Sequence, residues 1–440
     1  MSEREPGTIL IRGGRVLDPA RGFDCVSDLL IEEGIVTAID AGIDPIEGAI
    51  EIDASGCLVT PGLVDPHVHL REPGGEHKET IATGTASAVA GGFTTVCCMP
   101  NTTPTIDSCH TLEFIRMRAL ETARCRVFVV AAATLGRLGE EIAPIASLVE
   151  AGAVGISDDG DVVADSQMML DVLRTCAQVD RVFMQHAQDP ALTRGASMNS
   201  GPTASKLGLI GWPKLAEELI VERDIRMLAQ TGGRYHVQHV SSAGTVEILR
   251  RAQDRGLAAT GEASPHHLLL TDEACDGYDT SAKMNPPLRT ADDVEALRKG
   301  VADGTLSILA TDHAPHTQGE KAEDFETAPF GIVGLDSALG LYAKALVESG
   351  HIDWSRLIAL LTIEPARLVD LDERGVGRLE VGLPADVTVI DPDMTWQVDP
   401  DEFASKGRNT PFTDVEVTGR PVVTIVGGTI AYRLDGAFNA

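Results

Sequence analysis

The sequence of 440 residues predicts an α/β protein built on a closed (β/α)8 barrel of the TIM type, with a second, β-rich module. Three observations support this fold class. Apolar runs rich in Val and Ile alternate with segments at helical spacing through the middle of the chain, which is typical of parallel βα units. Eight of these runs have the length of a strand. Both ends of the chain instead show short strand patterns separated by Gly-rich turns.

The expected elements follow this alternation along the chain. The barrel strands are expected at residues 64–69, 94–101, 127–134, 155–159, 182–186, 235–239, 258–262 and 307–312. Helices are expected at 110–123, 166–179, 213–229, 243–255, 291–302 and 335–347. Strands outside the barrel are expected at 8–16, 28–39, 49–59, 377–391 and 421–433, and a long surface loop at 187–206. A doubly wound open sheet is the alternative fold, but no Gly-x-Gly-x-x-Gly sequence opens a helix after the first strand.

The composition limits the class of protein. Hydrophobic residues make up 43% of the chain and charged residues 23%, and no apolar run reaches the roughly 18 residues that span a bilayer. The first seven residues lack the apolar stretch of a secretory leader, and the eight cysteines show no paired framework, so we expect a cytoplasmic protein with reduced thiols. A net charge of −30 argues against binding to nucleic acid or anionic membranes, and an anionic substrate would need a locally positive pocket.

Six imidazole or carboxylate side chains stand at the ends of expected barrel strands. They lie at the C-terminal ends of the first, fourth, fifth, sixth and eighth strands, where TIM barrels build their active sites. Histidine and carboxylate groups suit zinc and similar divalent ions. A single histidine at a strand end is more commonly a hydrogen-bonded residue of the rim, but six converging residues predict a metal centre. These residues are His67, His69, Asp159, His186, His239 and Asp312.

Spacing and charge suggest roles within this set. His67 and His69 are two positions apart, so both imidazoles can lie on one face of a strand and bind one metal ion. Two neighbouring dications repel unless an anion lies between them, and Asp159 is placed to be that bridge, whereas Asp158 would point to the opposite face. Asp312 is expected to bind one metal ion and to act as the general base that hands a proton on to the leaving nitrogen.

Several longer motifs resemble those of the dihydroorotases within the amidohydrolase superfamily. The segment DPHVHLREPG at 65–74 is similar to their metal motif. The resemblance continues through GGFTTV at 91–96, MPN at 99–101, SDDG at 157–160, QH at 238–239, KMNPP at 283–287, TDHAPH at 311–316 and PFG at 329–331. It implies a barrel at residues 61–370, flanked by a small β-sandwich that residues 1–60 and 371–440 build together.

The resemblance also implies a reaction and its cofactor. Members of this family interconvert dihydroorotate and N-carbamoyl-L-aspartate in pyrimidine synthesis. Transferred by position, His67, His69 and Asp312 would hold one zinc ion, and His186 and His239 a second. Many relatives bridge the two ions with a carboxylated lysine, but no lysine occurs from residue 79 to 205. The chain therefore resembles the long-chain (type I) group in which an aspartate, here Asp159, forms the bridge.

A substrate with a carboxylate requires a fixed cation in the pocket, and Arg71 is the candidate. It follows His69 by two residues on the metal side of the turn, where a planar guanidinium can bind a carboxylate. The alternative for Arg71 is a surface salt bridge with Glu72 or Glu76, and Asn101 can equally be an ordinary turn residue. The resemblance implies further substrate contacts from His69, Asn101, Asn285, His316, Phe330 and Gly331.

Two alternative functions stay open at this point. One is another cyclic amidohydrolase, such as a hydantoinase or allantoinase, although the bridging lysine of those enzymes is missing and Arg71 favours a ring that carries a carboxylate. The other is an inactive homologue that serves as a structural partner of aspartate transcarbamoylase, which would be expected to lose metal ligands that this chain retains. We expect a homo-oligomer acting on a small molecule, and association of the active enzyme with aspartate transcarbamoylase is a further alternative.

The remaining histidines and the paired cysteines receive structural interpretations. His266 and His267 are expected to make structural hydrogen bonds, and His313 to point away from its neighbour Asp312. His236 is out of phase with His239 on its strand and is left out of the site. Cys97 and Cys98 are expected to be small core residues.

Overall fold

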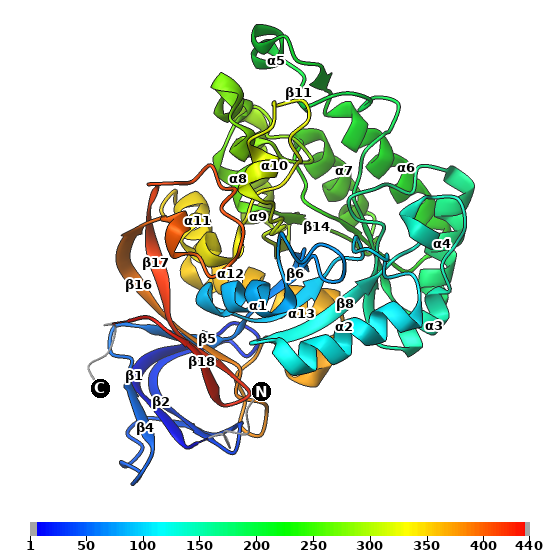
Figure 1. Cartoon of the computed structure of the whole chain (residues 1–440). Helices are drawn as coiled ribbons and strands as arrows, with labels where there is room; N and C mark the ends of the chain where they lie inside the picture. The colour runs from blue at the N-terminus through cyan, green and yellow to red at the C-terminus, as the bar shows by residue number, and fades with distance from the viewer. Residues whose placement is uncertain (1–6, 436–440) are drawn as a thin grey trace.

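A barrel of parallel strands forms the centre of the molecule in the computed structural model, which describes residues 7–435 (Figure 1). Its strands are β6 (Leu63–Val68), β7 (Phe93–Cys98), β8 (Arg126–Ala131), β9 (Ala153–Ile156), β10 (Val182–Gln185), β13 (Arg234–Val237), β14 (Ala259–Ala263) and β15 (Ile308–Leu309). They pair in chain order from β6 to β15. A parallel bridge between Val68 and His313 joins the two ends of this row, so the sheet closes on itself. The predicted barrel is confirmed.

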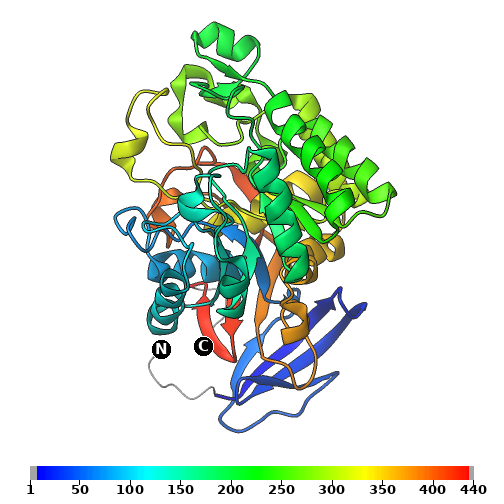
Figure 2. The ribbon, with the colours of Figure 1, turned by 90° about the vertical axis from the view of Figure 1, so that its right-hand side faces the viewer.

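Helices surround the barrel and connect successive strands (Figure 2). Polar side chains cap several of them, since Ser108, Asp165 and Ser242 each accept a hydrogen bond from a backbone N–H of the first helical turn. The longer helices are α1 (Ile81–Ala90), α2 (Cys109–Thr122), α3 (Ile145–Glu150), α4 (Ser166–Gln178), α6 (Leu215–Thr231), α7 (Ala243–Asp254), α9 (Ala291–Asp303), α12 (Trp354–Leu361) and α13 (Ile363–Leu368). The expected helix at 335–347 is divided into η4 (Leu335–Ser337), α11 (Ala338–Tyr342) and the π-helical turn η5 (Ala343–Val347).

Short helical segments occur in the loops above and below the barrel. They are η1 (Leu135–Arg137), α8 (Pro265–Leu269), η2 (Asp272–Tyr278), η3 (Thr280–Ala282), α10 (Gln318–Lys321), η6 (Asp372–Arg374) and η7 (Pro400–Glu402). No helix within residues 7–435 is long and apolar enough to cross a membrane. All eight cysteines have free thiols, and Cys97 and Cys98 are buried as expected.

The two ends of the chain build one further eight-stranded sheet beside the barrel (Figure 1). The strands are β1 (Ile9–Asp18), β2 (Phe23–Glu32), β3 (Ile35–Asp40), β4 (Ile50–Asp53), β5 (Leu58–Pro61), β16 (Val387–Gln397), β17 (Glu416–Val426) and β18 (Thr429–Arg433). The antiparallel pairing of β5 with β16 joins the two chain ends. Buried Val, Ile and Leu side chains from both ends form a separate apolar core. The domain limits at residues 60/61 and 370/371 stay predictions.

Several expected segments differ from the structure. The expected strand at 49–59 falls on β4 and β5, that at 421–433 on β17 and β18, and that at 377–391 begins only at Val387, with β16. The single strand at 28–39 is instead two strands, β2 and β3, because Glu33 and Gly34 both have positive φ (50° and 82°) and form a tight two-residue turn. The loop at 187–206 contains β11 (Met198–Asn199) and the start of α5 (Pro202–Leu207), and β11 pairs with β12 (Gly211–Trp212). Pro202 suits the first turn of a helix, since its missing N–H is not needed there. Residues 1–6, on which the expected lack of a leader chiefly depends, lie outside the described residues.

An ion pair fastens the barrel to the terminal sheet. Arg126 at the start of β8 donates from Nε and Nη2 to the two carboxylate oxygens of Asp386, at 2.6 and 3.2 Å. Asp386 also accepts the Gly427 N–H at 2.7 Å. Because the carboxylate joins three chain segments, its loss leaves several partly buried donors without a partner.

We expect Asp386→Ala to lower the free energy of unfolding by about 1–3 kcal/mol, because donors in a half-buried site lose a charged acceptor. Urea denaturation followed by circular dichroism measures the change. Asp393→Ala is the matched control, since Asp393 is an aspartate with an exposed side chain on β16, the strand that Asp386 directly precedes. Equal stability of the two variants would contradict the role of the ion pair.

Candidate active site

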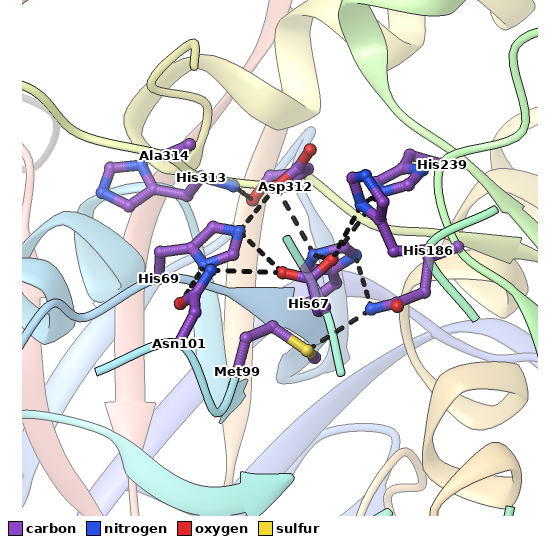
Figure 3. A network of polar contacts seen from close by, with 12 residues as sticks. His67, His69, Met99, Asn101, His186, His239, Asp312, His313 and Ala314 are labelled. Atoms are coloured by element: carbon purple, nitrogen blue, oxygen red, sulfur yellow. Dashed lines mark hydrogen bonds and ion pairs between the residues drawn. The ribbon is translucent and has the colours of Figure 1, made fainter. Parts of the chain in front are cut away.

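The six predicted metal ligands meet at the C-terminal rim of the barrel, and all six are buried (Figure 3). Most follow their strands, because the barrel strands end earlier than the sequence pattern suggested. His67 is still within β6, His186 comes directly after β10, and Asp159 and Asp312 lie three residues beyond β9 and β15. The sequence analysis thus predicted the convergence correctly, although most of the ligands stand at the starts of loops.

The closure of the barrel places the first and last of these segments together. The His69 N–H donates to the His313 carbonyl at 2.9 Å, and Asp65 accepts the Thr311 hydroxyl at 2.6 Å. The His69 Nε2 atom consequently lies 2.9 Å from Asp312 Oδ1. Asp312 has a φ of 48°, a conformation that costs a non-glycine residue about 1–3 kcal/mol and that the surrounding rim must hold.

Asp159 lies at the centre of the cluster. Its Oδ1 is 3.4 Å from His67 Nε2, 3.3 Å from His186 Nδ1 and 3.7 Å from His239 Nε2. Its Oδ2 is 3.5 Å from His69 Nε2. Four imidazoles therefore face the two oxygens of one carboxylate, which is the arrangement expected of a bridging ligand.

Outer hydrogen bonds orient the two histidines of the His-x-His pair. His67 Nδ1 lies 2.6 Å from Glu262 Oε1, and His69 Nδ1 lies 2.9 Å from Asn101 Oδ1. With Nδ1–H donating to these oxygens, each ring turns the lone pair of Nε2 toward Asp159 and Asp312. A lone pair that faces carboxylate oxygens at 2.9–3.5 Å is repulsive unless a cation lies between them.

The electrostatics of the cluster match this requirement for positive charge. Although burial raises the pKa of Asp159, the imidazoles of His67, His186 and His239 hold it well below its usual value. Burial lowers the pKa of His67, but Asp159, Glu262 and Asp312 together raise it well above its ordinary value. A divalent cation could supply the same compensation while leaving the imidazoles neutral.

Two groups of side chains have the spacing of metal ligands. One group is His67, His69 and Asp312, and the other is His67, Asp159 and His239, with ligand atoms within 4.8 Å of one another in each group. His186 belongs to neither group, but its Nδ1 is 2.8 Å from His239 Nε2. The buried Nε2 atoms of His67 and His186 have no hydrogen-bond partner. The donor set therefore fits two neighbouring divalent cations.

Glu262 is a residue that the sequence analysis missed. It is completely buried at the end region of β14, where it also accepts from the His239 backbone N–H at 3.1 Å and lies 2.9 Å from His236 Nε2. Burial raises the pKa of Glu262, but His67 and His236 lower it below its usual range, so the side chain is a carboxylate. An acidic residue in the last positions of an apolar strand was the available signal. His236, which was left out of the site, holds Glu262 in place.

The substrate-contact candidates line a cavity of about 330 Å³ beside the cluster. Every predicted site residue except His67 lines this cavity, and His67 is completely buried.

Arg71 lines the cavity while its Nε donates to the Pro315 carbonyl at 3.3 Å, and no carboxylate within residues 7–435 pairs with the guanidinium. The alternative of a salt bridge with Glu72 or Glu76 is wrong, since Glu72 pairs instead with Arg118. Burial lowers the pKa of Arg71 to about 10, so the group remains cationic at neutral pH.

His316 and Lys78 leave the Arg71 guanidinium free to bind a ligand. The Lys78 ammonium donates to His316 Nδ1 at 3.3 Å, so His316 Nε2 carries the proton and donates to the Phe330 carbonyl at 2.9 Å. Burial, together with the charges of Arg71 and Lys78, lowers the pKa of His316 to about 2 and keeps the ring neutral. Because Nε2 already bears a hydrogen, Arg71 Nη2 at 3.4 Å cannot donate to it.

The other predicted substrate contacts differ in whether their polar atoms already have hydrogen-bond partners in the protein. Asn101 bridges His69 and Asp159, and its Nδ2 is 3.4 Å from Asp159 Oδ2. Asn285 donates to Gln188 at 3.2 Å, while its buried Oδ1 has no partner and can accept an N–H. The Gly331 N–H already donates to the Lys283 carbonyl at 3.0 Å.

Most residues that received structural interpretations have partners of their own, whereas the buried Nε2 atom of His266 has no hydrogen-bond partner among the described residues, contrary to the expected structural role. Asp158 accepts from the backbone N–H groups of Ala133 and Thr134 at 2.9 and 3.0 Å. His313 accepts the Gly334 N–H at 3.2 Å, and its ring lies away from the cluster (Figure 3). His267 Nε2 lies 2.9 Å from the Pro286 carbonyl. None of the three side chains faces the metal-ligand cluster.

Comparisons with known proteins identify the family of this chain. A sequence model of the family described as Dihydro-orotase-like matches residues 56–245. The chain is 48% identical over 427 residues to the dihydroorotase of Syntrophotalea carbinolica, covering 97% of this chain and 99% of that protein. It is 47% identical over 425 residues to the dihydroorotase of Pelotomaculum thermopropionicum, covering 97% and 98%.

Solved structures of related enzymes share the fold. The L-hydantoinase (dihydropyrimidinase) of Arthrobacter aurescens superposes with a TM-score of 0.87 at 25% identity, covering 97% of this chain and 96% of that one. The dihydropyrimidinase of Brevibacillus agri superposes with a TM-score of 0.84 at 22% identity, covering 97% and 95%, a likeness that concerns the fold alone.

We expect Glu262→Gln to weaken the binding of divalent metal by about 10–100-fold, because it removes the negative charge that orients His67. Competition with a chromogenic chelator measures the affinity without any assay of turnover. Asp224→Asn is the matched control, since Asp224 is an equally buried carboxylate in the same barrel that hydrogen-bonds Gln185 and Tyr235. Unchanged affinity in Glu262→Gln would show that His67 does not need this partner.

Proposed function

The chain belongs to the dihydroorotase family and is a cyclic amidohydrolase, and we propose that this cavity catalyses the reversible hydrolysis of dihydroorotate to N-carbamoyl-L-aspartate. The observation that carries the proposal is one cavity that joins a carboxylate–imidazole cluster to a partly buried guanidinium that no carboxylate within residues 7–435 pairs with. The cluster suits attack on an amide, and Arg71 suits the carboxylate on the substrate ring. A cytoplasmic location and the role in pyrimidine synthesis accompany this activity.

We infer that the cluster holds two zinc ions. His67, His69 and Asp312 would bind one, His186 and His239 the other, and Asp159 would bridge them. When bound, the ions would polarise the amide carbonyl and lower the pKa of the attacking water. The unpartnered Nε2 atom of His67, which faces Asp159 and Asp312 at 3.4 and 3.5 Å, supports this assignment.

Asp312 is the group that moves the proton. Burial raises its pKa, but His67, His69 and His239 lower it below the ordinary value, so Asp312 is a carboxylate that can accept a proton. Water adds its oxygen to the ring carbonyl carbon while Asp312 takes a proton from it. The carbon–nitrogen bond of the ring amide then breaks as Asp312 returns that proton to the leaving nitrogen. Ring closure follows the same path in reverse.

The other residues of the cavity bind and orient the ring. Arg71 would hold the ring carboxylate with a charge-assisted pair of hydrogen bonds, assisted by Asn101 and by the neutral His316. The free Oδ1 of Asn285 would accept a ring N–H. His69, Phe330 and Gly331 would form the remaining walls. The positive charge of Arg71 provides the local attraction that a chain with a net charge of −30 otherwise lacks.

The two alternative functions are less well supported. The likeness to hydantoinases extends over the whole fold. However, Asp159 would take the role of their bridging carboxylated lysine, and a ring without a carboxylate would offer Arg71 no group to bind. An inactive scaffold would not need the six ligands that converge here. A homo-oligomer, and association with aspartate transcarbamoylase, remain predictions.

We expect Asp312→Asn to reduce kcat by at least about 10²–10⁴-fold, because the amide removes the proton acceptor while keeping the size of the side chain. Steady-state hydrolysis of dihydroorotate, with elemental analysis of zinc on the same sample, measures the effect. Asp161→Asn, which changes an exposed carboxylate two residues beyond Asp159, is the control for altered charge. Near-normal turnover of Asp312→Asn with zinc retained would refute the role of Asp312.

We expect Arg71→Met to lower kcat/KM for dihydroorotate by about ten- to a hundredfold, since a buried charge-assisted pair contributes about 1.5–3 kcal/mol. Zinc content should not change. The unaltered enzyme should prefer dihydroorotate to dihydrouracil, the same ring without the carboxylate, by at least this factor. Equal hydrolysis of the two rings would instead indicate a generic cyclic amidohydrolase.

A further inference from the structure

Two buried lysines outside the metal cluster hold one wall of the cavity. Lys283 follows η3, and Lys321 ends α10. The Lys283 ammonium donates to the backbone carbonyls of Glu326 and Ala328 at 3.0 and 2.6 Å. The Lys321 ammonium donates to the carbonyls of Pro329 and Gly331 at 2.9 and 3.2 Å. Four carbonyl oxygens of one loop, residues 326–331, thus turn inward onto two ammonium groups.

The burial of these ammonium groups is unusual because no carboxylate compensates it. Lys283 is 2% exposed and Lys321 8%, and neither forms an ion pair within residues 7–435. The Lys283 Nζ lies 4.5 Å from the centre of the Phe330 ring, which adds a cation–π contact. Buried charges normally require a paired charge. Here the hydrogen bonds to the carbonyls of this loop replace the lost hydration of the two ammonium groups. The loop and the two lysines are therefore mutually dependent.

This loop forms part of the wall of the cavity. Pro329, Phe330 and Gly331 line the cavity. The Phe330 carbonyl accepts the His316 Nε2–H, and this hydrogen bond sets which face of His316 meets Arg71. Gly331 has a φ of 146°, and a Cβ there would lie 2.7 Å from the Ala314 carbonyl oxygen. Little displacement of the loop is compatible with these contacts.

We propose that Lys283 and Lys321 are positioning residues for substrate binding, whose ammonium groups hold residues 326–331 so that Phe330 and Gly331 wall the cavity and His316 leaves Arg71 free. The identity of the substrate rests on the proposed function. The position of the loop does not, because it follows from the lysine–carbonyl contacts alone. Neither lysine touches a metal ligand, so their loss should affect binding of the ring far more than its hydrolysis once bound.

The kinetic experiment uses Lys283→Met and Lys321→Met, which keep the length of the side chain and remove the charge. Each is expected to raise KM for dihydroorotate by about ten- to a hundredfold, with kcat within about threefold and zinc content unchanged. Lys344→Met is the control for loss of a lysine, since Lys344 also donates to a backbone carbonyl, that of Glu416 at 3.0 Å, but lies in η5 and makes no contact with this loop. An unchanged KM, or a loss confined to kcat, would overturn the proposal.

A spectroscopic experiment tests the loop without any assay of activity. The rings of Trp212 and Phe330 meet edge to face with their centres 6.0 Å apart, so 5-fluorotryptophan at position 212 reports the position of the loop. Its ¹⁹F resonance, assigned with Trp212→Phe, should shift in both lysine variants and not in Lys344→Met. This result distinguishes the two proposals, because it can hold even if dihydroorotate is not the substrate. An unshifted resonance in both variants would contradict the role of Lys283 and Lys321 in holding residues 326–331.

If the methionine variants do not fold, the unaltered enzyme provides the test through pH. Burial lowers the pKa of Lys283 to about 8 and that of Lys321 to about 7, so both ammonium groups lose a proton and their charge as the pH rises through this interval. The two lysines also repel each other, and the other titratable groups near them are Glu326 near Lys283, and Asp279, Cys275 and the neutral His316 near Lys321. Burial raises the pKa of Cys275 to about 12, which removes it from this interval.

The Trp212 resonance should therefore move between pH 6.5 and 9, with a midpoint between about 7 and 8, while KM for dihydroorotate rises over the same interval. A resonance and a KM that both stay constant across this range would overturn the proposal. Where a variant carrying both Lys283→Met and Lys321→Met folds, the loss of this titration in it identifies the two lysines as the source.

Discussion

The parallel bridge between Val68 and His313 closes the barrel, and the geometry of the active site depends on this closure. It joins the first strand to the segment after the last one, so that His69 and Asp312, 243 positions apart in the chain, come within 2.9 Å. The hydrogen bond from the Thr311 hydroxyl to Asp65 joins the same two segments. Without this seam the histidine pair and the proton-transferring carboxylate would belong to separate edges of an open sheet. The terminal sheet supports the barrel from the side but supplies no ligand.

The metal-ligand cluster carries negative charge from its carboxylates, and the cavity beside it carries positive charge from Arg71. Asp159 and Asp312 lie among imidazoles whose outer nitrogens are held by Glu262 and Asn101, so the negative charge faces the position of the cations. Positive charge comes from Arg71, which lines the same cavity, and from the two lysines behind its wall, none of which pairs with a carboxylate within residues 7–435. A substrate with a carboxylate at one end and an amide at the other fits this polarity. The same arrangement explains how a strongly acidic chain can bind an anion.

The residues of the site that were predicted correctly all lie at or after the end of an apolar strand pattern, which is visible in the sequence. His67, Asp159, His186, His239 and Asp312 all follow apolar strand patterns, and the barrel topology brings such positions together wherever the strands end. Glu262 follows the same rule and could have been found, but an acidic residue without a histidine neighbour carries a weaker signal. Lys78, Lys283 and Lys321 could not have been found this way, because their roles depend on backbone carbonyls and ring nitrogens of distant segments. Nothing in the local sequence of a lysine indicates that it will be buried.

The sequence by itself determined the fold class, the eight barrel strands, the convergence of six metal-ligand candidates and the presence of a guanidinium among them. These follow from periodicity and from residue type, both of which are local properties of the chain. Only the tertiary structure decided which nitrogen of each histidine faces the cluster, that Arg71 pairs with no carboxylate, and that two lysines hold the loop at 326–331. Each of these depends on hydrogen bonds between segments far apart in the chain. The donors and acceptors of these hydrogen bonds meet only when the barrel has closed and the loops at its rim have packed.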